Sequence, residues 1–383
     1  MAAARADSPA APQGAWGLGA GEGRDAVWDG RVIDADAHVQ LPGLEVLADY
    51  LDDHWLEFIR ERGFLGPGLG ATAMVGSVRT YPPNAPTSVR EEWRPAAGRM
   101  PASELALVQG QLLDPWRLER AILTCNPGVD FVRHPDFALA LARAVNDWLI
   151  AEWLERDERL RASIVVPSRQ PAQIAAEIER VGSHPGFVSV FMPVRSDRPY
   201  GNRIWHPVYR AMVAHDLVMN LHWGGTPDGP PTPVGWPSWY AEEYALEPQL
   251  YMAQVTSLLA EGAFAEFPQL RVTVAEGGFT WLPSLWWRLQ KDWKGLRRDT
   301  PWVSRPVIET IREHMRFTVA PTDAGPPEEL ARVLEWLGSD EILLFATDYP
   351  HRHEDDLRAL LAAAPESMRA PLMAASAAAW YRL

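Results

Sequence analysis

Residues 32–38 read Val-Ile-Asp-Ala-Asp-Ala-His, an apolar run that becomes polar toward its carboxyl end. Side chains alternate between the two faces of an extended strand, so this spacing places Asp34, Asp36 and His38 on one face. Short runs of this kind, rich in β-branched residues, recur along the chain and alternate with segments of helical period. The expected strands cover residues 32–36, 121–125, 162–166, 187–192, 217–222, 271–276, 316–319 and 342–347.

Helices are expected between these strands, over residues 137–155, 171–181, 208–215, 248–263, 281–296, 327–337 and 355–363. A strand followed by a helix, repeated to eight with parallel crossovers, is typical of a (β/α)8 TIM barrel, an α/β fold that needs about 250 residues. The chain has 383 residues. We therefore predict a barrel domain over residues 31–383, preceded by a disordered leader over residues 1–30 that is rich in Ala, Gly and Pro.

Two long insertions are expected at the carboxyl ends of strands. Residues 63–100 follow the first strand and are dense in Gly and Pro, whereas residues 223–247 follow the fifth and contain Trp223, Trp236 and Trp239. Loops of this length in a compact domain are usually lids or walls of a binding site. Contact with a second subunit is the alternative, and the Trp-rich composition is compatible with a homodimer.

Composition excludes several classes of partner. The formal net charge of -14 disfavours nucleic acid and anionic lipid surfaces, because both are negatively charged. Charges or prolines interrupt each apolar stretch before it reaches the roughly 18 residues of a membrane span, so we expect a cytoplasmic protein with no membrane partner. Cys125 is the only cysteine in the sequence, which excludes an internal disulfide and a cysteine zinc cluster.

Polar residues gather at the carboxyl ends of four expected strands, where the loops of a parallel barrel form a cup. The first strand ends in Asp36-Ala37-His38, the fifth in His222 and the sixth in Glu276, and Asp348 follows the eighth. One histidine at a strand end is more often structural than a ligand. Imidazole and carboxylate groups on four converging strand ends indicate a metal site instead.

Mixed histidine and carboxylate ligation suits a borderline divalent ion, with Zn²⁺ as the first expectation and Mn²⁺ or Fe²⁺ as alternatives. Such an ion lowers the pKa of bound water toward about 7 and polarises a substrate oxygen. Asp348 is suited either to bind the ion or to accept a proton from that water. The sequence therefore indicates chemistry on a small-molecule substrate.

The motifs at these strand ends resemble the amidohydrolase-related family, the branch of the amidohydrolase superfamily that contains aminocarboxymuconate semialdehyde decarboxylase and related aromatic-acid decarboxylases. They are Asp-Ala-Asp-Ala-His at 34–38, His222, Glu-Gly-Gly at 276–278 with Trp-Leu-Pro at 281–283, and Asp-Tyr-Pro-His at 348–351. The resemblance covers residues 32–383. It implies a single divalent metal bound by Asp36, His38, His222 and Asp348.

Two positions depart from the family pattern. Asp36 stands where characterised decarboxylases have His or Glu, and Glu276 stands where many have a His that handles protons. A carboxylate at position 276 can act as a general base, as a general acid if burial raises its pKa, or as a metal ligand. This second change weakens the case for decarboxylation without weakening the case for metal binding.

Lysine is almost absent, since Lys291 and Lys294 are the only two in the sequence. Binuclear members of the superfamily often bridge their metals with a carbamylated lysine on the fourth strand, and residues 187–192 contain none. The resemblance thus implies one metal ion. The same absence excludes a Schiff-base mechanism.

Three functions remain open from the sequence. The leading interpretation is a mononuclear metal-dependent hydrolase of a small cyclic or aromatic substrate, in which Asp348 or Glu276 accepts the proton of a metal-activated water. The alternative is a metal-dependent, non-oxidative decarboxylase of an aromatic or unsaturated acid, and the third is a metal-binding protein without turnover.

Four further side chains lie near the strand ends. Arg195 is placed to bind a substrate carboxylate or to form a surface ion pair. His351 is placed to contact substrate or to make a structural hydrogen bond, and His353 is expected outside the site. Cys125 is expected to be an unreactive wall residue.

Overall fold

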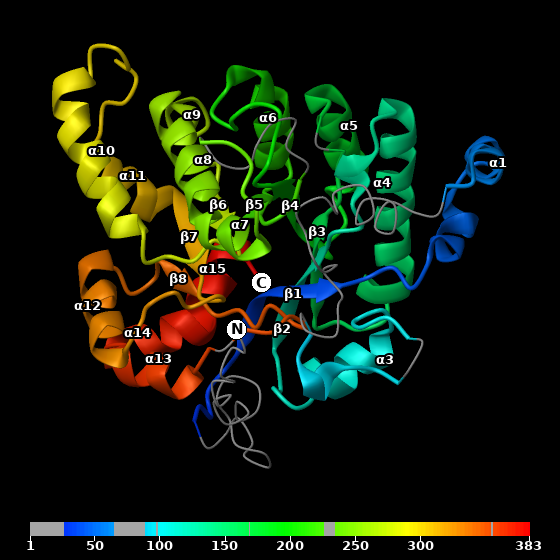
Figure 1. Cartoon of the computed structure of the whole chain (residues 1–383), viewed down its shortest axis with the longest axis horizontal. Coiled ribbons are helices and arrows are strands. Elements are labelled where there is room, and N and C mark those ends of the chain that lie inside the picture. The colour runs from blue at the N-terminus through cyan, green and yellow to red at the C-terminus, as the bar shows by residue number, and fades with distance from the viewer. Residues whose placement is uncertain (1–26, 65–88, 97–98, 168, 226–233, 354) are drawn as a thin grey trace, which may run out of the picture.

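The computed structural model describes residues 27–64, 89–96, 99–167, 169–225, 234–353 and 355–383. Eight parallel strands form one sheet in the order of the chain, and the connecting helices are arranged around them (Figure 1). This arrangement confirms the predicted TIM barrel. The strands are β1 (Ile33–Val39), β2 (Arg120–Cys125), β3 (Leu160–Ile164), β4 (Phe187–Pro193), β5 (Val218–His222), β6 (Val272–Val274), β7 (Met315–Thr318) and β8 (Leu343–Leu344).

Backbone hydrogen bonds join the last strand to the first and close the sheet. The Ala35 amide donates to the Phe345 carbonyl at 2.9 Å, and the Asp348 amide donates to the Asp36 carbonyl at 3.0 Å. Closure satisfies the backbone groups that an open sheet would leave free at its edges. The regular part of β8 is shorter than the expected 342–347, although residues beyond it still bond to β1.

The main helices follow the expected pattern, mostly within three residues at each end. Helices α5 and α12 have the predicted bounds, and the expected helix 137–155 is α4 continued by the π-helix η7. Seven of the described helices carry proline in their first turn, where a backbone N–H would have no acceptor within the helix. The described helices are η3 (Leu44–Tyr50), α1 (Asp53–Arg62), η4 (Glu91–Trp93), α3 (Leu105–Val108), η5 (Gln109–Leu113), η6 (Val129–Phe131), α4 (Pro135–Leu149), η7 (Ile150–Leu154), α5 (Pro171–Val181), η8 (Arg203–Trp205), α6 (His206–Ala214), α7 (Tyr240–Leu246), α8 (Pro248–Ala260), α9 (Ala263–Glu266), α10 (Leu282–Leu296), α11 (Val307–His314), α12 (Pro327–Leu337), α13 (Leu357–Ala363), α14 (Glu366–Ala370), η9 (Pro371–Ala375) and α15 (Ser376–Tyr381).

Helix α15 closes the amino-terminal end of the barrel. Its Trp380 and Tyr381 pack with Ile33 and Val218, the first residues of β1 and β5, in an apolar cluster separate from the main core. The Trp380 indole N–H and the Tyr381 hydroxyl donate to Thr273 Oγ1 at 3.0 and 2.8 Å. Because side chains fill this end of the barrel, we expect a functional site at the carboxyl ends of the strands.

The expected leader and insertions lie partly outside the described residues. Residues 1–26 of the leader, 65–88 and 97–98 of the first insertion, and 226–233 of the second are not described. The described part of the second insertion contains α7, which precedes α8. Over the ranges that the structure describes, no helix is both long and apolar enough to cross a membrane.

Candidate metal centre

Five polar side chains from four strand ends meet at the carboxyl end of the barrel. Asp36 and His38 belong to β1, His222 is the last residue of β5, and Glu276 and Asp348 follow β6 and β8. Each side chain is at most 12% exposed. The barrel brings them together because the carboxyl ends of neighbouring parallel strands open onto one cup.

Glu276 and Asp348 both have left-handed backbones, with φ of 57° and 52°. A residue other than glycine in this region is strained by about 1 kcal/mol or more, and such residues are typical of functional sites. The turn at Glu276 is held on both sides. Its amide donates to Thr318 Oγ1 at 3.2 Å, and the Tyr251 hydroxyl donates to the Ala275 carbonyl at 2.8 Å.

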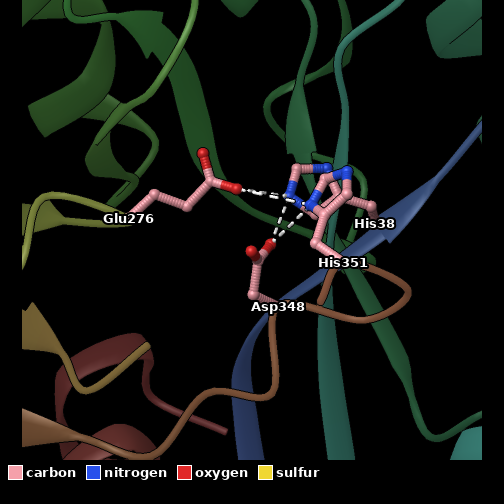
Figure 2. A group of neighbouring side chains, drawn as sticks. All are labelled: His38, Glu276, Asp348 and His351. Carbon is pink, nitrogen blue, oxygen red and sulfur yellow. Dashed lines mark hydrogen bonds and ion pairs between the residues drawn. The ribbon is translucent and has the colours of Figure 1, made fainter. Parts of the chain in front are cut away.

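Potential metal-ligand atoms form two groups that share His38, and within each group these atoms lie within 4.8 Å of one another. Figure 2 shows the Glu276 and Asp348 carboxylates directed at the rings of His38 and His351. His38 Nε2 lies 2.9 Å from Asp348 Oδ1 and 3.3 Å from Glu276 Oε1. The groups are His38, Glu276, Asp348 and His351, and Asp36, His38 and His222.

Three buried atoms of the cluster have no hydrogen-bond partner among the described residues: Asp36 Oδ2, His38 Nε2 and His222 Nε2. His222 Nε2 lies only 3.2 Å from Asp36 Oδ2, but not in a hydrogen-bonding direction. Each unsatisfied buried polar atom costs about 1–3 kcal/mol. A divalent cation would satisfy all three, because imidazole nitrogen and carboxylate oxygen are its ordinary ligands. The residues present therefore fit a metal ion.

The backbone orients the ring of His222 for this role. Its Nδ1 lies 2.8 Å from the carbonyl oxygen of Trp223, so Nδ1–H donates there, and in the neutral ring Nε2 carries the lone pair. Histidines that bind metals are commonly fixed in this way through their second nitrogen. The bond leaves Nε2, which faces Asp36, as the ligand atom.

The carboxylates around the two strand-end histidines favour a positive charge at this place. Burial and the neighbouring His351 lower the pKa of His38, but Asp348 and Glu276 outweigh them and raise it to about 9. Burial likewise lowers the pKa of His222, but Asp36 and Glu276 raise it to about 9. In the metal-free protein, the protons on His38 and His222 thus supply the positive charge that a bound metal ion would supply.

The pKa values of the two strained carboxylates, Glu276 and Asp348, are shifted in the opposite direction. Burial raises the pKa of Asp348, but the adjacent His351 and His353 outweigh it and hold that pKa well below its usual range. Burial and Asp348 raise the pKa of Glu276, but His222, His351 and His38 outweigh them and lower it. Both carboxylates are therefore ionised at neutral pH, as a metal ligand or a general base requires.

Binding of Mn²⁺ to the metal-free protein is expected to release protons at pH 7.5. His38 and His222 have pKa values of about 9, so both are protonated at this pH and must become neutral to bind a metal. We expect release of about two protons per ion, and tighter binding as the pH rises from 7 to 9. Calorimetric titration in PIPES and in Tris, which differ in ionisation enthalpy, measures the protons released. Heats that do not depend on the buffer would contradict this prediction.

Asp34 does not join the cluster, although alternation along the strand places it on the same face as Asp36. The pairing of β1 with β2 changes register between Asp34 and Ala37. The Thr347 amide and hydroxyl donate to the two Asp34 carboxylate oxygens at 3.0 and 2.5 Å. Burial raises the pKa of Asp34 to about 7 despite these bonds. Asp34 thus fastens β1 to the residue that precedes Asp348.

The segment after β8 contributes two histidines to the cluster. His351, with a side chain 21% exposed, has its Nδ1 3.0 Å from Asp348 Oδ1 and 3.5 Å from Glu276 Oε1. The expectation that His353 lies outside the site is wrong, because its Nε2 contacts Asp348 Oδ2. No periodic pattern applies to this irregular segment, so the sequence carried no signal for that contact.

Arg195 and Cys125 line the barrel end without joining the ligand groups. Arg195 is buried, and its Nη2 donates to Glu243 Oε1 of α7 at 2.5 Å. The surface ion pair considered from the sequence is therefore a buried one, with a partner 48 residues away. Cys125 is buried as well, and burial raises the pKa of its thiol to about 12, which keeps it protonated and unreactive.

Solved structures of decarboxylases resemble this fold. The 5-carboxyvanillate decarboxylase of Novosphingobium aromaticivorans, complexed with manganese and 4-hydroxy-3-methoxy-5-nitrobenzoic acid, superposes with a TM-score of 0.66 at 19% identity, covering 93% of this chain and 97% of that one. A dihydroxybenzoic acid decarboxylase from Polaromonas, with bound manganese and the inhibitor 2-nitroresorcinol, gives 0.61 at 18% identity, covering 92% and 97%. These likenesses show that the fold is shared.

Sequence comparison extends the likeness to the whole barrel. The gamma-resorcylate decarboxylase of Rhodococcus jostii is 26% identical over 267 residues, which cover 63% of this chain and 76% of that protein. The family model Amidohydro_2, described as Amidohydrolase, matches residues 33–383, from the start of β1 to the end of the chain. The protein therefore belongs to this amidohydrolase family.

Proposed function

We propose that this protein is a metal-dependent decarboxylase, which releases the carboxyl group of an aromatic carboxylic acid as carbon dioxide. The observation that carries the proposal is the convergence of unpartnered Asp36, His38 and His222 atoms beside the ionised carboxylates of Glu276 and Asp348. Three proteins to which the chain is similar, a gamma-resorcylate, a 5-carboxyvanillate and a dihydroxybenzoic acid decarboxylase, support the same reaction.

One divalent cation is proposed at this site, held by Asp36, His38, His222 and Asp348. When bound, it supplies a Lewis acid for the substrate carboxylate and an adjacent oxygen. Manganese in two structural neighbours favours Mn²⁺ over the Zn²⁺ expected from the sequence. Asp36 and Asp348 contribute the negative charge that makes the site selective for a cation.

The remaining residues of the cluster are assigned to the substrate and its proton. Decarboxylation breaks the bond between the ring carbon and the carboxyl carbon, and the ring carbon takes a proton as carbon dioxide leaves. Because both carboxylates are ionised, we assign the source of this proton to His351, where burial lowers the pKa but Asp348 and Glu276 outweigh it and raise it to about 10. Glu276 or Asp348, whose oxygens lie 3.5 and 3.0 Å from His351 Nδ1, takes this proton and passes it to the ring carbon. His351 is the most exposed of these side chains and is assigned to substrate contact, as is Arg195.

The position of His351 bears on the choice between decarboxylation and hydrolysis. The sequence has Glu276 where many family decarboxylases have a histidine. An imidazole nevertheless lies beside Glu276, because His351 Nδ1, from the segment after β8, lies 3.5 Å from Glu276 Oε1, and its ring lies 4.5 Å from the ring of His38. The proposed site thus keeps an imidazole beside the metal ligands, which favours decarboxylation over hydrolysis.

Turnover in heavy water tests the reaction. The protein loaded with Mn²⁺ is incubated in D₂O with 2,6-dihydroxybenzoate, with 5-carboxyvanillate and with a panel of other aromatic acids. We expect carbon dioxide and an equal amount of product with one deuterium on the ring carbon that carried the carboxyl group, measured by mass spectrometry and NMR. The deuterium enters because the ring carbon takes its proton from groups that exchange with solvent.

Two results would contradict the proposal. Hydrolysis of amides, esters or lactones, with no deuterium on carbon and no reaction of the acids, would support the hydrolase instead. Tight binding of an acid with no product from any compound of the panel would support a binding protein.

A further inference from the structure

Inside the barrel, below the proposed metal ligands, a row of buried polar side chains leads to Asp36. All of them are at most 2% exposed, and each comes from a different strand. The proposed function assigns none of them a role. From the ligand inward they are Thr124 on β2, Asn220 on β5, Ser163 on β3 and Ser189 on β4.

The first member of this row, Thr124, gives the two carboxylate oxygens of Asp36 different surroundings. The Thr124 hydroxyl lies 2.9 Å from Asp36 Oδ1, inside the barrel. Asp36 Oδ2 accepts no hydrogen bond from the part of the chain that the structure describes, and it lies 3.2 Å from His222 Nε2, on the side of the ligand atoms. One carboxylate oxygen is thus occupied by the protein, and the other faces the place of the metal.

The direction of each hydrogen bond follows from the chemistry of the groups. An ionised carboxylate only accepts, so the Thr124 hydroxyl must donate to Asp36. Thr124 Oγ1 then accepts from Asn220 Nδ2 at 3.3 Å, and the same amide group donates its second hydrogen to Ser163 Oγ at 3.1 Å. Ser163 and Ser189 share the last bond, at 2.8 Å. From Asn220 the bonds therefore run toward Asp36 on one side and toward Ser163 on the other, and the Thr124 hydrogen is committed to Asp36.

We propose that Thr124 is a positioning residue, which turns Asp36 so that Oδ2 faces the metal, and that Asn220 holds the Thr124 hydroxyl in the required direction. This inference rests on the proposed metal site. Neighbours that orient ligands in this way typically change metal affinity by about 10- to 100-fold when they are removed.

Direct titration with Mn²⁺ alone tests the inference without reference to catalysis. The free-ion signal in electron paramagnetic resonance gives the dissociation constant of each metal-free protein. Thr124→Val keeps the shape of the side chain but removes its hydroxyl, and we expect it to weaken Mn²⁺ binding about 10- to 100-fold. Thr124→Ser restores the hydroxyl and is expected to bind close to wild type.

Ser189→Ala is the matched control, because Ser189 lies at the far end of the row and contacts Ser163 rather than Asp36. We expect it to bind Mn²⁺ as wild type does. Circular dichroism checks the fold of each variant. If Thr124→Val does not fold, Asn220→Ala replaces it. This variant keeps the hydroxyl but frees it to turn, and we expect it to bind Mn²⁺ more weakly than Ser189→Ala does.

Each contrary result has a distinct meaning. A folded Thr124→Val protein that binds Mn²⁺ as tightly as wild type would overturn the role of Thr124 and leave the metal site standing. Equal weakening by Thr124→Ser and Thr124→Val, or binding by Asn220→Ala as tight as by the control, would also overturn it. Wild-type protein that binds no Mn²⁺ would overturn the metal site and this inference together.

Discussion

The His222→Ala variant is expected to lose both its bound metal and its turnover. His222 is the one proposed ligand from β5, and its Nε2 is already oriented by the bond from Nδ1–H to the Trp223 carbonyl. Alanine removes this ligand and leaves Asp36 Oδ2 without its nearest nitrogen. Loss of the metal removes several kcal/mol of charge stabilisation, so kcat should fall by at least about 10³-fold. Elemental analysis after dialysis and kcat on the acid identified in the screen measure the two effects.

His314 provides a matched control for this substitution. It is also a buried histidine whose Nδ1 bonds to a backbone carbonyl, that of Leu270, at 3.0 Å, but it lies on α11 outside the ligand groups. The His314→Ala protein, once shown to be folded, is expected to keep its metal and its kcat. A His222→Ala protein that retains one metal ion per chain and turns over normally would contradict the proposed ligand set.

Replacement of Glu276 by glutamine is expected to separate turnover from metal binding. Glutamine has nearly the same size but cannot accept and return a proton as a carboxylate does. Groups that move protons in this way contribute about 10²- to 10⁴-fold to the rate, so kcat should fall by that factor. The metal content should remain near one ion per chain, because the four proposed ligands are unchanged. Kinetics and elemental analysis on the same sample give both quantities.

Glu177→Gln is the control for removal of a buried carboxylate. Glu177 is fully buried on α5, where it bonds to Asn146 and Arg180 away from the ligand groups. Folded Glu177→Gln protein is expected to turn over normally. Loss of the metal from Glu276→Gln would show instead that Glu276 is a ligand, and an unchanged kcat would show that it moves no proton.

Local patterns in the sequence predicted most of the fold. The bounds of α5 and α12 were correct because the helical period of their apolar residues and the proline at their starts are properties of the segments themselves. Strand β8 was too long in the prediction. An apolar run shows that residues 342–347 are buried, but the length of the regular strand depends on how β1 and β7 pair with it.

The proposed ligand residues could also be found in the sequence. A parallel barrel brings the carboxyl ends of its strands to one cup, so Asp36, His38, His222 and Asp348 are neighbours whatever their separation along the chain. That general rule needed only the order of strands and helices. It did not extend to the contacts of Arg195, because its partner Glu243 lies on a helix whose place no periodicity determines.

The sequence alone thus determined which barrel this chain forms and which strand ends carry imidazole and carboxylate groups, because periodicity and parallel topology act through general rules. Only the tertiary structure decided the directions of those groups. It turned Asp34 toward Thr347, brought His353 onto Asp348 and set the Thr124 hydroxyl on Asp36. The physical reason is that a register shift in β1, left-handed turns at two carboxylates and bonds between distant strands depend on the packing of the whole barrel, which no single segment encodes.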